Sequence, residues 1–371
     1  MLFLPTLEGI RASYPQARIT LLVEPRSAGI GVITDLVDEV VTFDIKKRPL
    51  RAADFIQLIT IVRSGKYDLV VSSGSSPMVS GLLFLSGIPR RIGYNSNRLA
   101  RYLLTDPMPL NRYQYAGKMY HDLILKLPGA AAALPAIPRI KAGQQEQGSM
   151  ESLLAELSKE VGSDEKAERK NRKRVLFHPG TSRLAILKGL NKTWSPENWC
   201  KLAELIEKDK DVDVILAGGP DDKEAIEQIR AHLKPDSRVI STYGHTRSLK
   251  DLVGLIDICD LIVCVDSAPM HLSIALNKPT VALFGPTNED VLVPSGVDHF
   301  VVLRKEKLEQ DAAKGDSTQA QNAAATTMGQ ASFLYPGAPA VQLHAETVAQ
   351  SVWDLLKQAA HRDDSPAVRA D

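Results

Sequence analysis

The sequence has few cysteines, few aromatic residues and no long apolar run, and these shortages exclude several classes of protein. Cys200, Cys259 and Cys264 stand apart among apolar residues, and none belongs to a C-x-x-C pair. This pattern predicts buried free thiols in a reducing, cytoplasmic compartment. No apolar run reaches the roughly 18 residues that a membrane-spanning helix needs. No histidine cluster has the spacing of zinc ligands, so we expect neither a metal nor a cofactor.

The sequence also lacks an excess of either charge. Its 371 residues include 45 Lys and Arg against 44 Asp and Glu. A nucleic-acid-binding protein that relies on a large basic field is therefore not expected. The length exceeds what one hydrophobic core usually supports, about 250–300 residues, and favours two domains.

Short apolar runs alternate with segments of helical periodicity in both halves of the chain. In the first half, strands are predicted at Ile19–Val23, Val40–Phe43 and Leu69–Ser72, with helices at Ala52–Arg63 and Tyr115–Leu127. The second half repeats the alternation from Val175 onward, and its strands are continuous apolar runs, as in sheets covered on both faces. The pattern predicts an α/β protein with parallel sheets, because each crossover between parallel strands needs a helix.

The composition divides the chain into five stretches. We expect an N-terminal domain over 1–127, a linker rich in proline, alanine and charged residues over 128–173, and a C-terminal domain over 174–344. The segment 306–332 is rich in Ala, Gln, Thr and Lys and predicts a flexible excursion within the second domain. A closing helix over 345–361 should pack back onto the fold, and residues 362–371 are expected to form a disordered tail.

The strongest candidate site is the turn that follows the apolar run Leu261–Val265. Asp266 ends the predicted strand, and a helix should begin near Pro269, where proline suits the first turn. The free N–H groups and the positive end of the helix dipole would form an anion site, with His271 in the same turn. The structural alternative is an ordinary capped helix with Ser267 as its N-cap and a satisfied histidine.

Three further loops follow predicted strands. Phe177–Ser182 contains a Pro-Gly pair and two hydroxyl residues, and Lys192 comes shortly after it; His178 itself is interpreted as structural. Leu216–Glu224 contains two glycines, and Phe284–Thr287 ends in a hydroxyl residue. A polar loop or a tight strand–helix turn would also explain each of these loops taken alone.

All four loops lie at the carboxyl ends of strands in one predicted parallel sheet, so we expect them to form one site. Ligands of such sheets bind at that edge. N–H groups, hydroxyls, a lysine and a histidine suit the diphosphate of a nucleotide. The sequence contains neither a Walker-type phosphate loop nor a full dinucleotide fingerprint, which argues against an NTPase and against a redox Rossmann enzyme.

The order of these motifs resembles the ADP-heptose:lipopolysaccharide heptosyltransferases, which form glycosyltransferase family nine. The resemblance is specific over about 175–290 and weaker over 1–127. It implies a GT-B fold, in which two Rossmann-like, doubly wound domains face each other across a cleft. It also implies an inverting transferase that moves heptose from ADP-heptose, or a similar sugar nucleotide, to a Kdo or heptose unit of the lipopolysaccharide inner core. The N-terminal domain would bind that acceptor.

The resemblance also assigns the donor site residue by residue. The diphosphate would be bound by Thr181, Ser182, Lys192, Asp266, Ser267, Ala268 and His271. The nucleotide-binding candidates come from the loops themselves and not from the resemblance. Gly218 and Gly219 could lie against a nucleotide, Asp222 or Glu224 could take a ribose hydroxyl, and Thr287 could donate a hydrogen bond. A lipid-linked acceptor further implies peripheral contact with the inner face of the inner membrane, although the sequence shows no clear basic amphipathic anchor.

The sequence departs from the family at its N-terminus. Family members begin with a strand and a Gly-Asp turn, whose aspartate is thought to be the catalytic base. Met1–Ile10 aligns with the helix after that turn, so we expect the strand and the aspartate to lie just upstream of Met1. Glu8 should lie on the helix and is not a good substitute. Two alternatives stay open: a GT-B protein that uses another sugar nucleotide, and a nucleotide-binding remnant that is inactive for lack of this aspartate.

Overall fold

The computed structural model describes residues 1–45, 51–128, 136–161, 172–182, 185–186, 190–305 and 341–363. The chain divides into two compact units, one formed by Met1–Arg139 with Asp290–Ser295 and one by Ile140–Glu289 with Gly296–Asp371. Both contain parallel sheets joined by helices, which confirms the predicted α/β class. The excursion predicted at 306–332 lies outside the described residues, and so do residues 364–371 of the tail predicted over 362–371; its first two residues belong to the last helix, Ala345–Asp363.

The first unit contains two separate parallel sheets. The elements are α1 (Leu4–Ser13), β1 (Thr20–Val23), the 3-10 helix η1 (Pro25–Val32), β2 (Glu39–Thr42), α2 (Ala52–Ser64), β3 (Leu69–Val71), α3 (Pro77–Leu85), β4 (Arg90–Tyr94), α4 (Arg98–Leu103), β5 (Asp106–Met108), α5 (Ala116–His121) and the 3-10 helix η2 (Asp122–Ile124). β1 pairs with β2, and β4 lies between β3 and β5. Helix α1 packs on α5 and η2, whereas α3 packs on β4 and α4.

The core of the first unit lies between β4, β5 and the α5–η2 segment. Its buried side chains include Ile92, Met108 and Leu123. The Tyr94 hydroxyl donates a hydrogen bond to the Met119 carbonyl at 2.9 Å, so a large ring is buried without leaving its polar atom unsatisfied.

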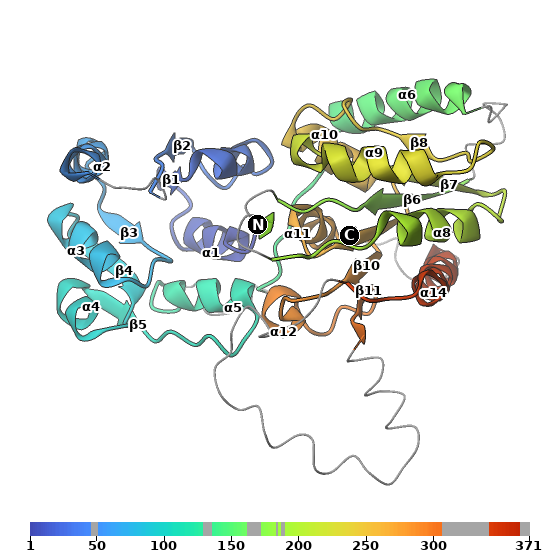
Figure 1. Ribbon diagram of the computed structural model, residues 1–371. Coiled ribbons are helices and arrows are strands. Elements are labelled where there is room, and N and C mark those ends of the chain that lie inside the picture. The colour runs from blue at the N-terminus through green and yellow to red at the C-terminus, as the bar shows by residue number, and fades with distance from the viewer. Residues whose placement is uncertain are drawn as a thin grey trace, which may run out of the picture. The chain divides into compact units, whose positions relative to one another are not determined.

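The second unit is a six-stranded parallel sheet with helices on both faces (Figure 1). Its elements are α6 (Gln144–Glu160), β6 (Lys173–His178), α8 (Pro196–Ile206), β7 (Val212–Leu216), the 3-10 helix η4 (Pro220–Asp222), α9 (Lys223–His232), β8 (Ile240–Ser241), α10 (Leu249–Asp257), β9 (Leu261–Val265), α11 (Ala268–Ala275), β10 (Thr280–Leu283), β11 (Phe300–Leu303) and α14 (Ala345–Asp363), and the short helix α12 (Glu289–Leu292) spans the unit boundary. The strand order is β11-β10-β9-β6-β7-β8. All strands are parallel, but the chain adds β7 and β8 on one side of β6 and then β9, β10 and β11 on the other, so the order of connection reverses between β6 and β9.

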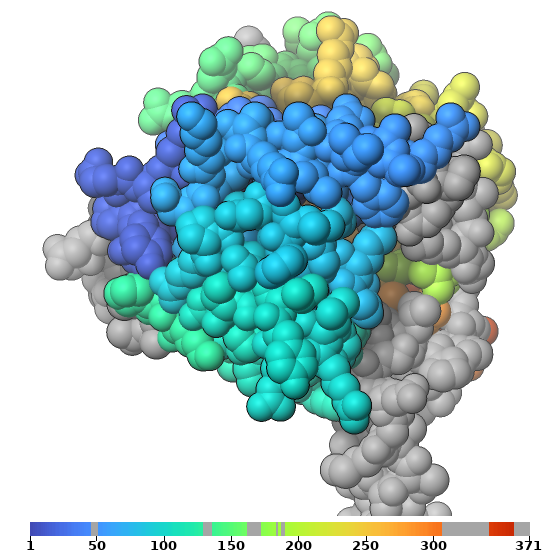
Figure 2. All heavy atoms as spheres, turned by 90° about the vertical axis from the view of Figure 1, so that its left-hand side faces the viewer, coloured from blue at the N-terminus to red at the C-terminus, as the bar shows by residue number. Residues whose placement is uncertain are grey.

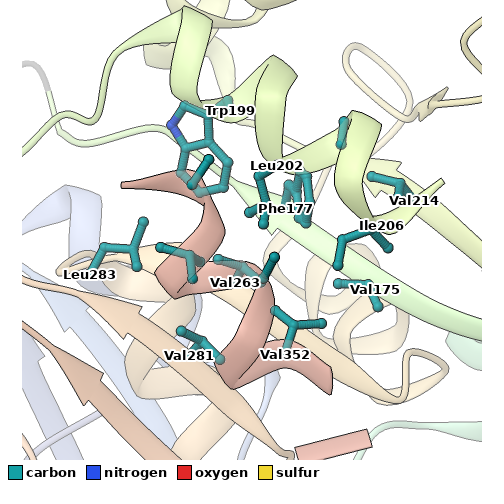
Figure 3. Close-up of a cluster of buried hydrophobic side chains, with 14 of the residues drawn as sticks. Val175, Phe177, Trp199, Leu202, Ile206, Val214, Val263, Val281, Leu283 and Val352 are labelled. Atoms are coloured by element: carbon teal, nitrogen blue, oxygen red, sulfur yellow. The ribbon is translucent and has the colours of Figure 1, made fainter. Parts of the chain in front are cut away.

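The main core of the second unit lies between the sheet and helices α8, α9 and α14. Figure 3 shows Phe177 and Val263 of the sheet against Trp199 and Leu202 of α8 and Val352 of α14. Helix α14 ends the described chain, and its packing against α8, β9 and β10 agrees with the closing helix predicted from sequence. On the other face α11 contacts β9 and β10, and α6 packs on α10.

The three cysteines are buried and free, as the sequence predicts. Burial raises the thiol pKa of Cys200 to about 11 and that of Cys259 to about 12, so both stay protonated and unreactive at neutral pH. In the described part of the chain, no helix combines the length and the apolar character needed to cross a membrane.

Candidate functional site

The predicted site loops lie in the second unit, at the carboxyl edge of its sheet. β6 and β9 are hydrogen-bonded neighbours, with His178 opposite Cys264, so the loops that follow them begin side by side. After β6 the chain continues to β7, and after β9 it continues to β10 on the opposite side. This reversal of strand order separates the two loops and opens a crevice in doubly wound sheets.

An ion pair joins two of the predicted residues across this point. The ammonium Nζ of Lys192 lies 2.6 Å from Oδ2 of Asp266 and 3.5 Å from the Asp266 carbonyl oxygen. The side chains of Lys192 and Asp266 are only 17% and 5% exposed. A carboxylate that is so well covered needs a paired cation, because an unpaired charge away from water is strongly destabilising. The ion pair therefore holds the Lys192 ammonium group in place beside Asp266.

His271 lies in the first turn of α11, close enough to Asp266 and Lys192 for their charges to affect its pKa. Burial is the largest influence and lowers the His271 pKa well below its usual range, so the ring is neutral at physiological pH. Its Nδ1 atom is buried and has no hydrogen-bond partner among the described residues. A neutral imidazole with an unused ring nitrogen beside a lysine can contact a bound anion without adding a second full charge.

Ser267 occupies the N-cap position of α11 but does not cap it through its side chain. Its hydroxyl instead donates to the Val265 carbonyl at 3.2 Å, which differs from the N-cap role that the structural alternative gave it. The extended backbone at Ser267, with φ −153° and ψ 179°, brings the chain from β9 into Ala268 and the first turn. The N-terminal end of α11 is therefore not blocked by this side chain.

The loop after β6 places its two hydroxyl residues differently. Thr181 is buried, whereas Ser182 is exposed and its hydroxyl accepts a hydrogen bond from the Ala185 amide at 3.3 Å. Gly180 is required at this loop, because a Cβ added there would lie 1.9 Å from Cγ of Asp222. The loops after β6 and β7 thus touch each other.

Asp222 is the polar centre of the loop after β7. It is buried, and its Oδ2 accepts a hydrogen bond from the Gly219 amide at 2.7 Å. Burial raises the Asp222 pKa to about 6. The neighbouring His178 is 3.9 Å away (Nε2 to Oδ2), and burial lowers its pKa to about 4. His178 is therefore neutral at physiological pH, and the structural role assigned to it stays a prediction.

Glu224 and Thr287 differ in their surroundings. Glu224 lies on the exposed side of α9, and its carboxylate accepts a hydrogen bond from Gln228 at 3.4 Å. Thr287, which follows β10, is buried, and its hydroxyl has no partner among the residues that the structure describes. The structure thus brings Asp222 into contact with the β6 loop, through Gly180, and leaves Glu224 in solvent.

A buried ion pair that the sequence did not indicate lies behind Thr287. Nη1 of Arg304 is 3.1 Å from Oε2 of Glu289 and donates to the Thr287 carbonyl at 3.2 Å. An arginine that directly follows the apolar run Phe300–Leu303 was the available signal, since a cation at the end of a buried strand needs a partner. Within the described ranges, no cluster of three or more His, Cys, Asp or Glu side chains could hold a metal ion.

The sequence is similar to those of known heptosyltransferases over most of its length. Residues 55–321 match the family model described as glycosyltransferase family 9 (heptosyltransferase). The chain is 26% identical to lipooligosaccharide heptosyltransferase 2 of Haemophilus ducreyi over 294 residues, which cover 77% of this chain and 79% of the relative. It is 27% identical to lipopolysaccharide heptosyltransferase 2 of Salmonella typhimurium over 296 residues, with the same coverage.

Solved structures show the same fold. The Escherichia coli ADP-heptose lipopolysaccharide heptosyltransferase II superposes with a TM-score of 0.68 at 22% identity, covering 97% of this chain and 95% of that one. A family 9 glycosyltransferase from Veillonella parvula superposes with a TM-score of 0.71 at 20% identity, covering 96% and 93%. These likenesses confirm the GT-B fold class predicted from the motifs.

Proposed function

Because the chain belongs to glycosyltransferase family 9 (heptosyltransferase), we propose that it transfers heptose from ADP-heptose to the inner core of lipopolysaccharide. Curated relatives named lipopolysaccharide heptosyltransferase 2 support the acceptor class, and the Escherichia coli protein of similar fold is named an ADP-heptose heptosyltransferase. The single observation in the structure that carries the proposal is the covered Lys192–Asp266 pair beside neutral His271.

The diphosphate of the donor is assigned to the loops after β6 and β9. Lys192 supplies a fixed positive charge, and Asp266 orients it rather than touching the anion, because a carboxylate repels a phosphate. His271 and the backbone of Ser267 and Ala268 at the start of α11 contribute neutral donors. The hydroxyls of Thr181 and Ser182 complete the set of proposed diphosphate ligands, with Thr181 in the buried position.

The nucleoside is assigned to the loops after β7 and β10. A Cβ added to Gly219 would meet only Oδ2 of Asp222, at 3.7 Å, so this side of the loop leaves room for a close approach by the ligand. A Cβ added to Gly218 would lie 3.0 Å from Cβ of Asp222, so Gly218 serves the packing of the same loop. The buried Thr287 hydroxyl, which has no partner among the described residues, can bond with the ligand. Of the two acidic candidates for the ribose, Asp222 already accepts from the Gly219 amide through Oδ2, whereas Glu224 is exposed at the start of α9. We retain both, and a comparison of single variants separates them.

The proposed reaction is an inverting displacement at the anomeric carbon. The bond from the acceptor hydroxyl oxygen to that carbon forms while the bond to the diphosphate oxygen breaks, and ADP leaves with the electron pair. The proton of the acceptor hydroxyl passes to a general base, a role that we assign to no residue of the described chain. Negative charge then grows on the diphosphate, and a preorganised cation with neutral N–H donors stabilises it. We assign the donor to the C-terminal domain and a Kdo or heptose acceptor to the N-terminal domain.

A donor screen tests the proposal. The purified chain is incubated with ADP-heptose, a UDP-hexose or a GDP-hexose and with lipopolysaccharide truncated in the inner core, and transfer is followed by mass spectrometry. Transfer of a single heptose from ADP-heptose alone is expected. Transfer from a UDP- or GDP-sugar would identify a different transferase. Tight ADP binding by calorimetry without any product would instead identify a nucleotide-binding protein without turnover.

A further inference from the structure

Helix α3 has an unusual distribution of side chains. Its nine residues, from Pro77 to Leu85, include no charged residue, and the only one that is buried is Ser80. Met78, Phe84 and Leu85 are 41%, 51% and 52% exposed. A surface helix of a globular protein normally buries its apolar stripe and presents polar residues to water. In helix α3, Val79, Leu82 and Leu83 are partly buried while Met78, Phe84 and Leu85 are exposed, so the helix is apolar on its outer side as well. This outer apolar side needs an explanation outside the core.

The adjacent helix α4 extends the same surface. α3 and α4 pack against each other, and Figure 2 shows the face of the first unit on which they lie. In α4 only Ala100 is buried, while Leu99 and Tyr102 are 48% and 82% exposed. The α3–α4 surface is defined by its exposed apolar residues and the arginines among them: Met78, Phe84, Leu85, Leu99, Tyr102, Arg91, Arg98 and Arg101.

The charge of this surface has one sign. Residues 69–105 contain four arginines and no aspartate or glutamate, in a chain whose formal net charge is only +1. Arg90 pairs with Asp106 at 3.2 Å, and no ion pair of Arg98 or Arg101 is found among the residues that the structure describes. The guanidinium of Arg91 lies over the Phe84 ring, 5.7 Å from its centre, and so joins the cationic and apolar parts of the surface.

We propose that the α3–α4 surface docks on a membrane that contains anionic phospholipid. The apolar side chains would enter the boundary between headgroups and acyl chains, and Arg98 and Arg101 would bind lipid phosphates. A long cationic side chain suits this position, because its stem covers apolar surface while its head stays polar. The inference rests on this surface alone, so it and the proposed transfer reaction can fail separately.

A second copy of the chain fits the surface less well. A two-fold contact would place this patch against itself. The arginines of one copy would then approach those of the other, and the patch offers no carboxylate to pair them. An anionic bilayer offers acyl chains to the apolar side chains and phosphates to the arginines, and we therefore propose it as the partner of this surface.

Vesicle flotation tests the proposal with the full chain. Wild-type protein is expected to bind vesicles of phosphatidylcholine and phosphatidylglycerol at a ratio of about 7:3 and to be released by raising the salt, since screening weakens surface charges. Phe84→Ser with Leu85→Ser should lower the partition coefficient by about tenfold or more. Arg98→Gln with Arg101→Gln should lower it by about 5-fold per cation on the anionic vesicles and have little effect on pure phosphatidylcholine.

Matched controls keep the test specific. Val32→Ser removes an apolar side chain that is 53% exposed on η1, and Lys201→Gln with Lys208→Gln removes two exposed cations in or next to α8. Both controls should bind vesicles like the wild type. All variants should retain the wild-type ADP affinity and thermal midpoint, which separates this proposal from the donor site.

Three outcomes would overturn the proposal. The first is wild-type protein that stays in solution with anionic vesicles. The second is equal vesicle binding by the α3 double variant and by Val32→Ser. The third is self-association in sedimentation that the α3 substitutions abolish without any change in vesicle binding, since this would show the surface to be a contact between copies of the chain.

Discussion

The Lys192–Asp266 pair is the residue-level feature on which the proposed donor site depends most. The geometry refines the sequence-based interpretation, which counted both residues as diphosphate ligands. With Nζ and Oδ2 only 2.6 Å apart, the carboxylate occupies one side of the ammonium. The other side remains for an anion, so the two residues have different tasks and their variants should behave differently.

Lys192→Ala should therefore lower kcat/KM by about 100-fold or more, because a charge that stabilises the leaving diphosphate is lost. The same change leaves the covered Asp266 carboxylate unpaired, and the free energy of unfolding should fall by about 3 kcal/mol. Lys192→Met with Asp266→Asn removes both charges, so it should recover stability without recovering activity. Transfer kinetics and urea unfolding measure the two effects, with the exposed Lys201→Ala on α8 as a control. Recovery of activity in the double variant would contradict the assignment.

Asp222 offers a test through pH. Its folded pKa of about 6 is raised by burial above the ordinary aspartate pKa of 3.8, so the native state binds the extra proton between these pH values. That contribution to stability is present below about pH 4 and is lost as the pH rises through 6. Asn mimics the protonated form, so Asp222→Asn should match the wild type at about pH 4 and exceed it by about 1–2 kcal/mol at about pH 7.5.

Urea unfolding of Asp222→Asn and the wild type at several pH values gives the comparison. His178 titrates in the opposite sense, because burial lowers its pKa to about 4. It is present in both proteins and cancels in the difference, apart from its coupling to Asp222 across the 3.9 Å between Nε2 and Oδ2. Asp221→Asn, an exposed neighbour, is the control. A difference that is independent of pH would show that Asp222 is not desolvated.

At the scale of elements, the contact between α6 and α10 depends on a glycine. A Cβ added to Gly254 of α10 would lie 2.9 Å from the backbone carbon of Glu146 in α6, whereas one added to Gly148 of α6 would meet open space. Gly254→Ala should cost about 1–3 kcal/mol of unfolding free energy through overpacking. Gly148→Ala should add about 0.5–1 kcal/mol, because alanine favours the helix. Chemical denaturation measures both, and equal effects would show that α6 does not pack closely here.

The strands and helices of the second unit differ in how well the sequence pattern predicts them. The strands of the second unit were predictable, because continuous apolar runs such as Leu261–Val265 are buried on both faces and coincide with β9. Helix α6 begins at Gln144, inside the stretch that the sequence predicted as a linker over 128–173. Its first turns carry glutamines and Gly148, and it is held by packing on α10 rather than by its own periodicity.

The first unit was predicted less completely for a similar reason. Strand β4 begins with Arg90 and Arg91, so its sequence has no apolar run, yet it lies between β3 and β5 and contributes the buried Ile92. Its arginines bond outside the strand, with Arg90 bound to Asp106 and Arg91 to the Leu103 carbonyl. Such pairing depends on tertiary neighbours and leaves no local pattern to detect.

The sequence predicted which loops form the candidate site but not how those loops contact one another. Parallel topology alone brings loops that follow neighbouring strands to one edge, so Thr181 and Asp266 could be grouped from sequence. The contact that places the Asp222 carboxyl against Gly180 could not, because it depends on how two loops pack. The Glu289–Arg304 pair behind Thr287 joins residues on both sides of β11, and it too needed the fold.

At the scale of the whole molecule, the two units carry separate candidate surfaces. Every residue assigned to the donor lies in the second unit, and the α3–α4 surface belongs to the first. All three tryptophans, Trp194, Trp199 and Trp353, also lie in the second unit, whereas most tyrosines, including Tyr94 and Tyr115, lie in the first. Tryptophan emission therefore reports on the second unit alone.

This division makes the location of the donor site testable without a substrate. A ligand that binds only the folded state stabilises it by about 2.7 kcal/mol at about 100 times its dissociation constant. With ADP at that concentration, the urea midpoint followed by tryptophan emission should rise. Amide hydrogen exchange should slow in the loops after β6, β7, β9 and β10 and stay unchanged in α3 and α4 of the first unit. Protection by ADP confined to the first unit would place the nucleotide there, and the assignment of Lys192, Asp266 and His271 to the donor would be wrong.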